Sequence, residues 1–365
     1  MYKRLVAILI ALMSLASVSA QELEWSVDMN AVFHNREVEK SVIPGETYIF
    51  TRITPQIGVS MDSTRHRIMG GVTWYQPMND RLHGYKVLPA LYYQYKNREK
   101  GLDFKFGMIP NELNATFPTY LRSDSINFVQ PNIKGAVVSV DKPHFWFYSY
   151  LDWRQIQTQN RREAFDVTGQ LGWKTNKEQN QFSVSAVLRY NHLSVSKQHY
   201  EGEGVVDNFV FSTQLSYGHW WSNANLYLSA GMLMSCDRDR ISDNKWHTPI
   251  GFLATAKVNW KWLSLTENFY AGDPQMPLYE KYGGLLYHGD SFYHNKIYSR
   301  TDLVATIFQK DFLNLEARLT FHASEDKKTA FCQQLAVRFF IDNIIWKHHK
   351  NKPKGVHKLP LAPQF

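Results

Sequence analysis

Segments in which apolar and polar side chains alternate recur along the whole of this 365-residue chain. One of the most regular lies between residues 312 and 324, where the apolar set is Leu313, Leu315, Ala317, Leu319 and Phe321. A period of two residues places successive side chains on opposite faces of a β-strand. After residue 20, no apolar run approaches the ~18 residues that a membrane-spanning helix requires. The pattern therefore indicates an all-β chain whose strands have one apolar and one polar face.

About sixteen such segments can be counted, and most are long enough for the ~9–11 residues of a tilted membrane strand. They lie near 22–34, 46–60, 66–77, 86–97, 102–109, 134–142, 145–154, 165–175, 180–195, 206–220, 224–236, 248–262, 263–272, 298–310, 312–324 and 330–342. The sequence thus predicts a transmembrane antiparallel up-and-down β-barrel of about 16 strands. A large secreted β-sandwich or solenoid is the soluble alternative.

The ends of the chain predict export. Residues 1–20 combine a basic start, an apolar core over 5–15 and a small-residue cleavage site at Val18-Ser19-Ala20, as in a secretory signal peptide. A short transmembrane anchor is the alternative. We expect the barrel to occupy 21–346, with a long loop at 110–133, and residues 347–365 to form a basic periplasmic tail.

The net charge and the two cysteines limit which partners and which disulfide the chain is expected to have. The formal net charge is +8, which in an exported chain points to anionic lipid headgroups or anionic solutes and away from nucleic acid. The mean hydropathy of −0.39 suits strands with one polar face. Cys236 and Cys332 have opposite strand parity, so we expect them to stay unpaired.

Short and long connections roughly alternate between the expected strands, as in membrane barrels with short periplasmic turns and longer outer loops. The two longest connections are 110–133 and 273–296. Aromatic residues also gather near strand ends, as in the girdles at a membrane interface, although aromatics favour strands in general. Glu267 shares parity with apolar neighbours, which would aim a carboxylate at lipid, so we expect a bulge or a shifted strand boundary there.

The strand pattern and the Phe106-Gly107-Met108-Ile109-Pro110 sequence resemble Gram-negative, Bacteroidetes-type outer-membrane porins of the sixteen-strand kind, including the phosphate-selective porin O/P type. The resemblance implies a location in the outer membrane, contact with outer-membrane lipid, passage of small solutes, and a homotrimer as one oligomeric option. It also implies that loop 110–133 folds into the barrel and constricts it. The tail beyond residue 346 and the lack of an acidic run or dense lysine ladder depart from this family.

If the long loop folds inward, Glu112, Arg122 and Asp124 are the expected constriction residues. Strand parity places a set of basic residues on the lumen wall, and the basic bias favours anions among the solutes. This set is Arg52, Lys105, Arg189, Lys257, Lys261, Arg300, Arg318 and Arg338. The alternative for each is an ordinary wall residue paired with a neighbour.

We therefore expect a channel for passive diffusion of small solutes, not an enzyme, with no cofactor and no metal site. A second hypothesis is a plugged barrel that acts as an adhesin or anchors a surface complex through its long loops. A third is an enzyme at the outer rim that uses His288, Asp290 and Ser291. Against the third, no GxSxG, HExxH or CxxC spacing occurs.

Overall fold

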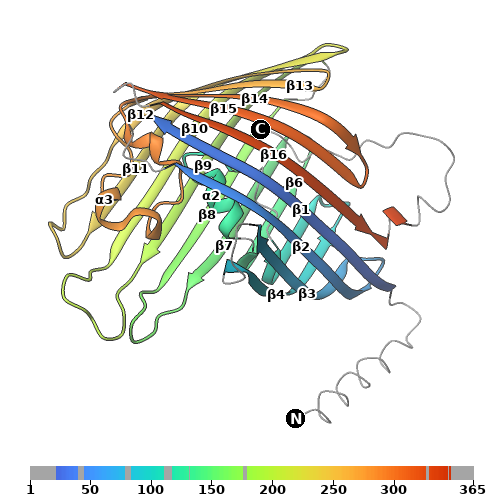
Figure 1. Cartoon of the computed structure of the whole chain (residues 1–365), viewed down its shortest axis with the longest axis horizontal. Coiled ribbons are helices and arrows are strands. Elements are labelled where there is room, and N and C mark those ends of the chain that lie inside the picture. Colours follow the sequence, from blue (N-terminus) through green and yellow to red (C-terminus); the bar gives the residue numbers. More distant parts are fainter. Residues whose placement is uncertain are drawn as a thin grey trace, which may run out of the picture.

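The computed structural model describes residues 22–39, 45–78, 84–110, 117–130, 132–175, 179–325, 329–343 and 345–346. Within these residues, sixteen antiparallel strands close into one barrel (Figure 1). Each strand pairs with its sequence neighbours, and β1 (Glu22–Glu39) closes the ring by pairing with β16 (Thr329–Asp342). The predicted fold class is confirmed. The expected signal peptide, the tail and Glu112 lie outside the described residues.

The boundaries of the strands follow the predicted segments to within a few residues. The strands between β1 and β16 are β2 (Glu46–Met61), β3 (His66–Pro77), β4 (Lys86–Asn97), β5 (Leu102–Pro110), β6 (Asn132–Asp141), β7 (Phe145–Gln155), β8 (Ala164–Lys174), β9 (Asn180–Leu193), β10 (Val206–Trp220), β11 (Ala224–Asp239), β12 (Ile250–Trp260), β13 (Leu263–Gly272), β14 (Ile297–Lys310) and β15 (Leu313–Ser324). β1 runs beyond the predicted residue 34 because Glu37, Val38 and Glu39 still pair with β16.

The outer face of the barrel is apolar and the inner face is polar. Leu215 and Phe106 are 69% and 60% exposed on the outside, whereas Lys105, next to Phe106, is 8% exposed and faces inward. Alternation along each strand produces this contrast, since consecutive side chains leave opposite sides of the sheet. Apolar side chains on the outside are what a hydrocarbon environment requires.

Most of the connections sort by length to the two ends of the barrel. Tight turns such as 98–101 lie at the end where the first strand begins, and the longer loops lie at the other end (Figure 1). Gly101 illustrates why the turns need particular residues, because its φ is +63° and a Cβ there would lie 1.9 Å from the Asp141 carbonyl oxygen. We call the tight-turn end the inner end and the long-loop end the outer end.

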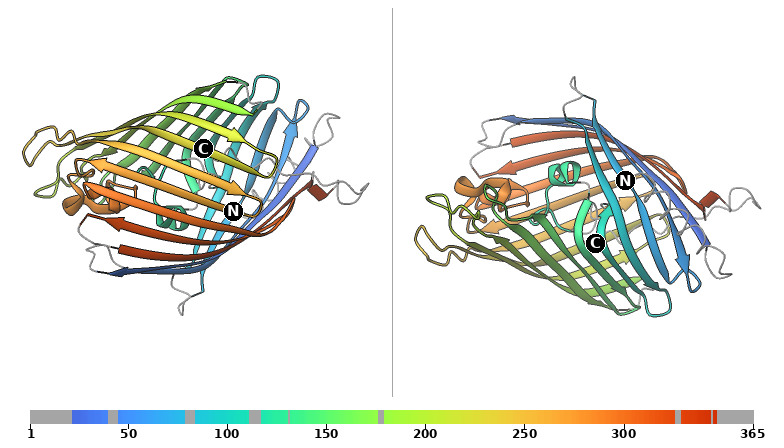
Figure 2. Two further views of the ribbon diagram at one scale, coloured as in Figure 1. Left: turned by 90° about the horizontal axis from the view of Figure 1, so that it is seen from above. Right: turned by 90° about the horizontal axis from the view of Figure 1, so that it is seen from below.

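Two long loops enter the barrel from the outer end. The first inserted loop, which the structure describes over residues 117–130, carries α2 (Asp124–Val129), whose N-cap is Ser123. The second inserted loop (273–296) carries α3 (Tyr279–Tyr282), η3 (Gly283–Leu285) and η4 (Ser291–His294). Figure 2 shows α2 inside the ring of strands. Among the described residues, no helix is both long and apolar enough to cross a membrane.

Glu267 corrects one expectation. The β12–β13 register runs without a shift through this residue, so the predicted bulge is absent from that ladder. Glu267 faces outward and accepts hydrogen bonds from the hydroxyls of Ser299 and Thr301 on β14, each at 2.5 Å. These hydroxyls satisfy the carboxylate oxygens locally, which lowers the cost of the lipid-facing position. The two cysteines are unpaired, as expected.

Candidate functional site

The two inserted loops bind each other inside the barrel. The Asp290 N–H donates to the Thr119 carbonyl at 2.8 Å, and the Ser123 N–H donates to the His288 carbonyl at 2.7 Å. The hydroxyls of Thr119 and Tyr293 lie 3.2 Å apart. Because backbone groups of both loops satisfy each other, the loops form one unit, which we call the plug (residues 117–130 and 273–296).

The plug shares a hydrophobic core with the barrel wall. Leu286 and Phe292 of the second inserted loop are fully buried. They belong to one cluster with Tyr120 and Leu121 of the first loop and with wall residues such as Leu193, Val206, Leu233, Tyr270 and Tyr298. A smaller cluster packs Phe128 of α2 against Phe50 and Tyr75 of the wall. The outer half of the lumen is therefore packed like the interior of a soluble domain.

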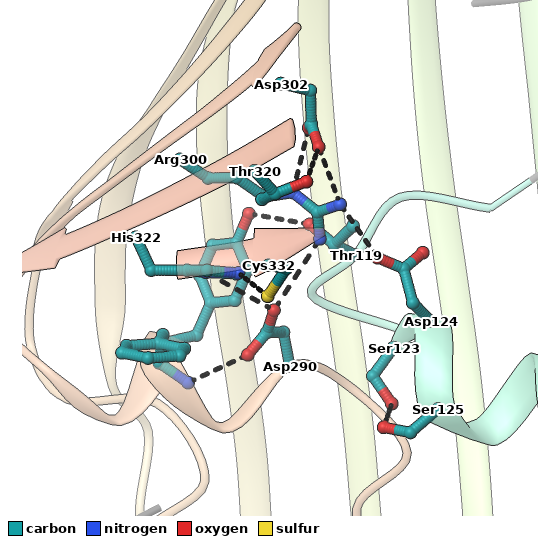
Figure 3. Close-up of polar contacts among 12 residues, drawn as sticks. Thr119, Ser123, Asp124, Ser125, Asp290, Arg300, Asp302, Thr320, His322 and Cys332 are labelled. Atoms are coloured by element: carbon teal, nitrogen blue, oxygen red, sulfur yellow. Dashed lines mark hydrogen bonds and ion pairs between the residues drawn. The ribbon is translucent and has the colours of Figure 1, made fainter. Parts of the chain in front are cut away.

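Arg300 of β14 ties both inserted loops to the wall (Figure 3). Its guanidinium group lies 2.8 Å from Asp302 on its own strand, 2.8 Å from Asp124 in α2 and 3.7 Å from Asp290 in the second loop. Thr320 adds a hydrogen bond to Asp302 at 2.6 Å. Since Arg300 is 2% exposed, one buried cation balances carboxylates from three parts of the chain.

Asp124 and His288 of the plug both have lowered pKa values. Burial by itself would raise the pKa of Asp124, but Arg300 and Arg318 outweigh it and hold this pKa well below its ordinary range. Burial lowers the pKa of His288 well below its ordinary value, and the nearby Arg154 and Arg189 lower it further. His288 Nε2 lies 2.7 Å from the Arg154 guanidinium. Asp124 is thus ionised and His288 neutral in the docked plug at neutral pH.

A thiol, an imidazole and a carboxylate meet beside Arg300. Cys332 Sγ lies 3.6 Å from His322 Nε2, and His322 Nδ1 lies 2.7 Å from the Tyr298 hydroxyl and 3.9 Å from Asp290. Cys332 and His322 are almost completely buried under the plug, and neither lines the cavities described next. The arrangement stabilises the joint between plug and wall without giving a lipid or solute access to the thiol.

The inner half of the lumen is open and polar. A cavity of about 800 Å³ lies below the plug and reaches the β12–β13 turn at Lys261 and Trp262. A second cavity of about 230 Å³ is lined in part by small hydroxyl side chains, among them Ser183, Ser185 and Ser229, and in part by apolar and aromatic residues. Lys261 and Trp262 are exposed residues of the β12–β13 turn at the inner end, so the larger cavity extends to the inner end of the lumen.

The predicted site residues fall into four groups. Arg122 and Asp124 belong to the plug and border the larger cavity, and Lys257, Lys261, Arg300 and Arg318 line that cavity. Arg52, Lys105 and Arg189 are buried in the wall. Arg338 is an exposed residue that pairs with Asp28 at 3.2 Å. Their roles in solute selection stay a prediction.

His288 and Asp290 do not lie at the outer rim. They are 1% and 4% exposed inside the lumen, where His288 contacts Arg154 and Asp290 lies near Arg300. Sequence reasoning missed Asp302 as a partner of Arg300. The available signal was its spacing of two residues, which places both side chains on the same face of β14.

A lipid-facing aromatic patch lies at the outer ends of β7 to β10. Trp153 stacks on Phe165 with ring centroids 5.0 Å apart, Phe165 lies 5.0 Å from His192, and Tyr190 stacks on Phe209 at 4.6 Å. These side chains share the outward parity of their strands. Rings of this kind suit the boundary between acyl chains and headgroups.

Charged side chains adjoin this patch. Asp207 lies opposite His192 in the β9–β10 register and binds Arg238 and Arg240, each at 2.9 Å. Arg238 also lies over the Trp246 ring at 4.4 Å. The Tyr190 hydroxyl is 3.0 Å from His192 Nδ1. We call the aromatic residues together with His192, Asp207, Arg238 and Arg240 the rim patch.

A family model described as "Lipid A 3'-O-deacylase-type" matches residues 15–347. The chain belongs to this family. The family is described by an enzymatic activity, so the expectation that the chain is not an enzyme is wrong. A comparison with curated proteins gives no match. Among the described residues, no group of three or more His, Cys, Asp or Glu side chains could hold a metal ion.

Solved structures with the same fold are outer-membrane proteins. An anion-selective porin from Comamonas acidovorans has a TM-score of 0.51 at 10% identity, over 88% of this chain and 99% of that chain. A loop L8 deletion mutant of OmpT, an outer membrane protein of Vibrio cholerae, has a TM-score of 0.52 at 9% identity, over 88% and 100%. The chain is thus an outer-membrane barrel of porin architecture.

Proposed function

We propose that this chain hydrolyses an acyl ester of a lipid A-type glycolipid in the outer leaflet. The observation that carries the proposal is the family match, which extends over almost the whole barrel. The packed plug supports it, because apolar side chains fill the outer half of the lumen and leave a poor path for free diffusion there. The proposal places the chemistry outside the barrel, where a lipid substrate resides.

The substrate limits where the catalytic groups can lie. Acyl chains of a bound glycolipid run along the lipid-facing wall, so the ester linkages stay at headgroup level near the outer end. His192 is an outward-facing imidazole at this level, and the aromatic rings beside it suit the upper acyl chains. Arg238 and Arg240, whose side chains are 26% and 48% exposed, suit a phosphorylated headgroup.

The proposed reaction is general-base hydrolysis. With its proton on Nδ1 and directed to the Tyr190 oxygen, His192 has a free electron pair on Nε2 that can accept a proton from water. The water oxygen attacks the ester carbonyl carbon, and the C–O bond to the sugar breaks. The proton held by His192 passes to the sugar oxygen, so the products are a fatty acid and an alcohol.

The test uses the refolded mature chain in mixed vesicles of lipid A and phospholipid, with mass spectrometry of the lipid. We expect lipid A to lose the mass of one acyl chain, and the His192→Gln variant to be slower by about 10²- to 10⁴-fold. His66→Gln is the matched control, because His66 also faces outward beside a tyrosine hydroxyl, at 2.8 Å from Tyr93, but at the inner end. If wild type leaves lipid A intact, the proposed function fails. Wild-type activity in His192→Gln would overturn the rim site alone.

We also propose a second function, a porin-like channel for small anionic solutes. The observation that favours it is the larger inner cavity, whose lining includes Lys257, Lys261, Arg300 and Arg318. Solutes would then pass only when the plug moves. A phosphate-type selectivity and a homotrimer belong to this proposal.

The channel proposal is tested by the reversal potential of the variant that lacks residues 112–130, in a planar bilayer under a salt gradient. We expect anion preference, and a weaker preference when Lys257→Gln and Arg318→Gln are added. Arg240→Gln, whose side chain pairs with Asp207 in the lipid-facing rim patch and not in the lumen, should leave the reversal potential unchanged. A cation-preferring pore contradicts the proposal.

A further inference from the structure

A small cavity lies at the joint between the plug and the wall. Its volume is about 20 Å³, and its lining includes Arg189 of β9, Asn208 of β10 and Gln275 of the second inserted loop. This volume accommodates one water molecule and little else. The cavity is separate from the two larger cavities of the inner half.

Three lining residues carry polar atoms that have no hydrogen-bond partner within the described part of the chain. These atoms are Asn208 Oδ1, Gln275 Oε1, and the Nε and Nη2 atoms of Arg189. Asn208 is 1% exposed, Gln275 is 3% exposed and Arg189 is 2% exposed. Buried polar groups in folded proteins nearly always have a partner, often an ordered water molecule.

The amide orientations are fixed by the other ends of the two side chains. Asn208 Nδ2 donates to Asp237 Oδ1 at 2.8 Å, and Gln275 Nε2 donates to the Tyr270 hydroxyl at 2.7 Å and to the Asp273 carbonyl. Exchanging oxygen and nitrogen would place acceptor against acceptor at Asp237 and Asp273. Both amide oxygens therefore need a donor from elsewhere.

We propose that one ordered water molecule occupies this cavity, donates to Asn208 Oδ1 and Gln275 Oε1, and accepts from Arg189. An anion would oppose two amide oxygens, and a cation would oppose the guanidinium group. Only a molecule that both donates and accepts satisfies all three residues. The site is thus a water site, independent of whether the chain is a hydrolase or a channel.

The water molecule gives Arg189 a second link to the plug. Its Nη1 atom donates directly to the Leu121 carbonyl of the first inserted loop at 3.0 Å. Through the water, the same guanidinium group also reaches Gln275 of the second loop. The Asp166 carboxylate lies 3.8 Å from Nη2 of the same guanidinium group. One wall residue then holds both loops.

The test is a crystal structure of the mature chain at a resolution that shows ordered water, with a second crystal soaked in bromide. We expect one solvent peak within about 2.7–3.2 Å of Asn208 Oδ1, Gln275 Oε1 and one guanidinium nitrogen of Arg189, without anomalous bromide signal. In Gln275→Met the peak should weaken or move, while the solvent in the 800 Å³ cavity stays unchanged. An empty cavity, a direct contact between Gln275 and Arg189, or a bromide peak at the site would overturn the proposal. An unchanged peak in Gln275→Met would remove Gln275 from the site and overturn it as stated.

Discussion

The outer and inner halves of the lumen are built from the same strands but differ in what fills them. The outer half holds a hydrophobic cluster in which Leu286, Phe292 and Tyr298 are fully buried. The inner half holds a cavity of about 800 Å³ lined mostly by charged and polar side chains. The strands alone therefore do not decide whether this barrel is a pore. Two inserted loops decide it, because their apolar side chains fill the outer half of the lumen.

Removing the cation at the joint should have the largest effect on stability. Arg300→Met leaves Asp124, Asp290 and Asp302 without their buried cation. Breaking a buried ion pair by removing one partner typically lowers the free energy of unfolding by about 3–5 kcal/mol. Urea unfolding of the refolded barrel in lipid, followed by tryptophan fluorescence, measures this loss. Arg338→Met is the control, since its pair with Asp28 is exposed and should cost about 1 kcal/mol or less. Equal losses in the two variants would show that the joint does not hold the plug.

Truncating a core side chain of the plug should come next. Leu286→Ala should destabilise the outer half by about 2–5 kcal/mol, because it leaves a cavity in a packed region. Val304→Ala is the inner-half counterpart, since Val304 borders a space that is already open, and it should change stability by about 0.5 kcal/mol or less. Hydrogen exchange of the amides in 273–296 reports the difference. Similar exchange in both variants would mean that the two halves are equally loosely packed.

Acid should loosen the plug by a smaller and graded amount. His288 is neutral when docked, because its pKa is lowered, and it takes up a proton below the ordinary value of about 6.5 once it is released. This contribution to docking is present above pH ~6.5 and is lost below it. The equilibrium constant for opening of the plug then rises by at most about tenfold for each pH unit. The pKa of Asp124 is also lowered, so its contribution is lost only as the pH falls below about 3.9.

The pH effect is measured by hydrogen exchange of residues 117–130 between pH 7.5 and 5, corrected for intrinsic exchange rates. His288→Gln should remove the step near pH 6.5. A step that persists in His288→Gln would assign the titration to another group.

Alternation predicted the barrel closely and the plug hardly at all. The segment predicted at 312–324 is β15 (Leu313–Ser324), because each lipid-facing position must be apolar whatever the distant contacts are. Leu286 and Phe292 carry no such local constraint. Their burial depends on wall residues such as Leu193 and Leu233 far away in sequence, and no period in 273–296 records that contact.

In the candidate site, too, strand alternation predicted the wall residues but not the loop residues that contact them. Parity placed Arg300 in the lumen, but its partners Asp124 and Asp290 arrive from two different loops, so their meeting could not be predicted from strand periodicity. The rim patch was missed for a related reason. His192 and Asp207 were counted as ordinary members of two segments, and only the β9–β10 register brings them opposite each other.

The most direct test of the closed outer half is single-channel recording of the refolded mature chain in a planar bilayer, beside the variant that lacks residues 112–130. The packed plug predicts a membrane without sustained current steps for the wild-type barrel at neutral pH, and discrete large steps for the deletion variant. Sustained steps of equal size in both proteins would contradict the account, because the outer half of the lumen would then be open despite the buried cluster around Leu286 and Phe292.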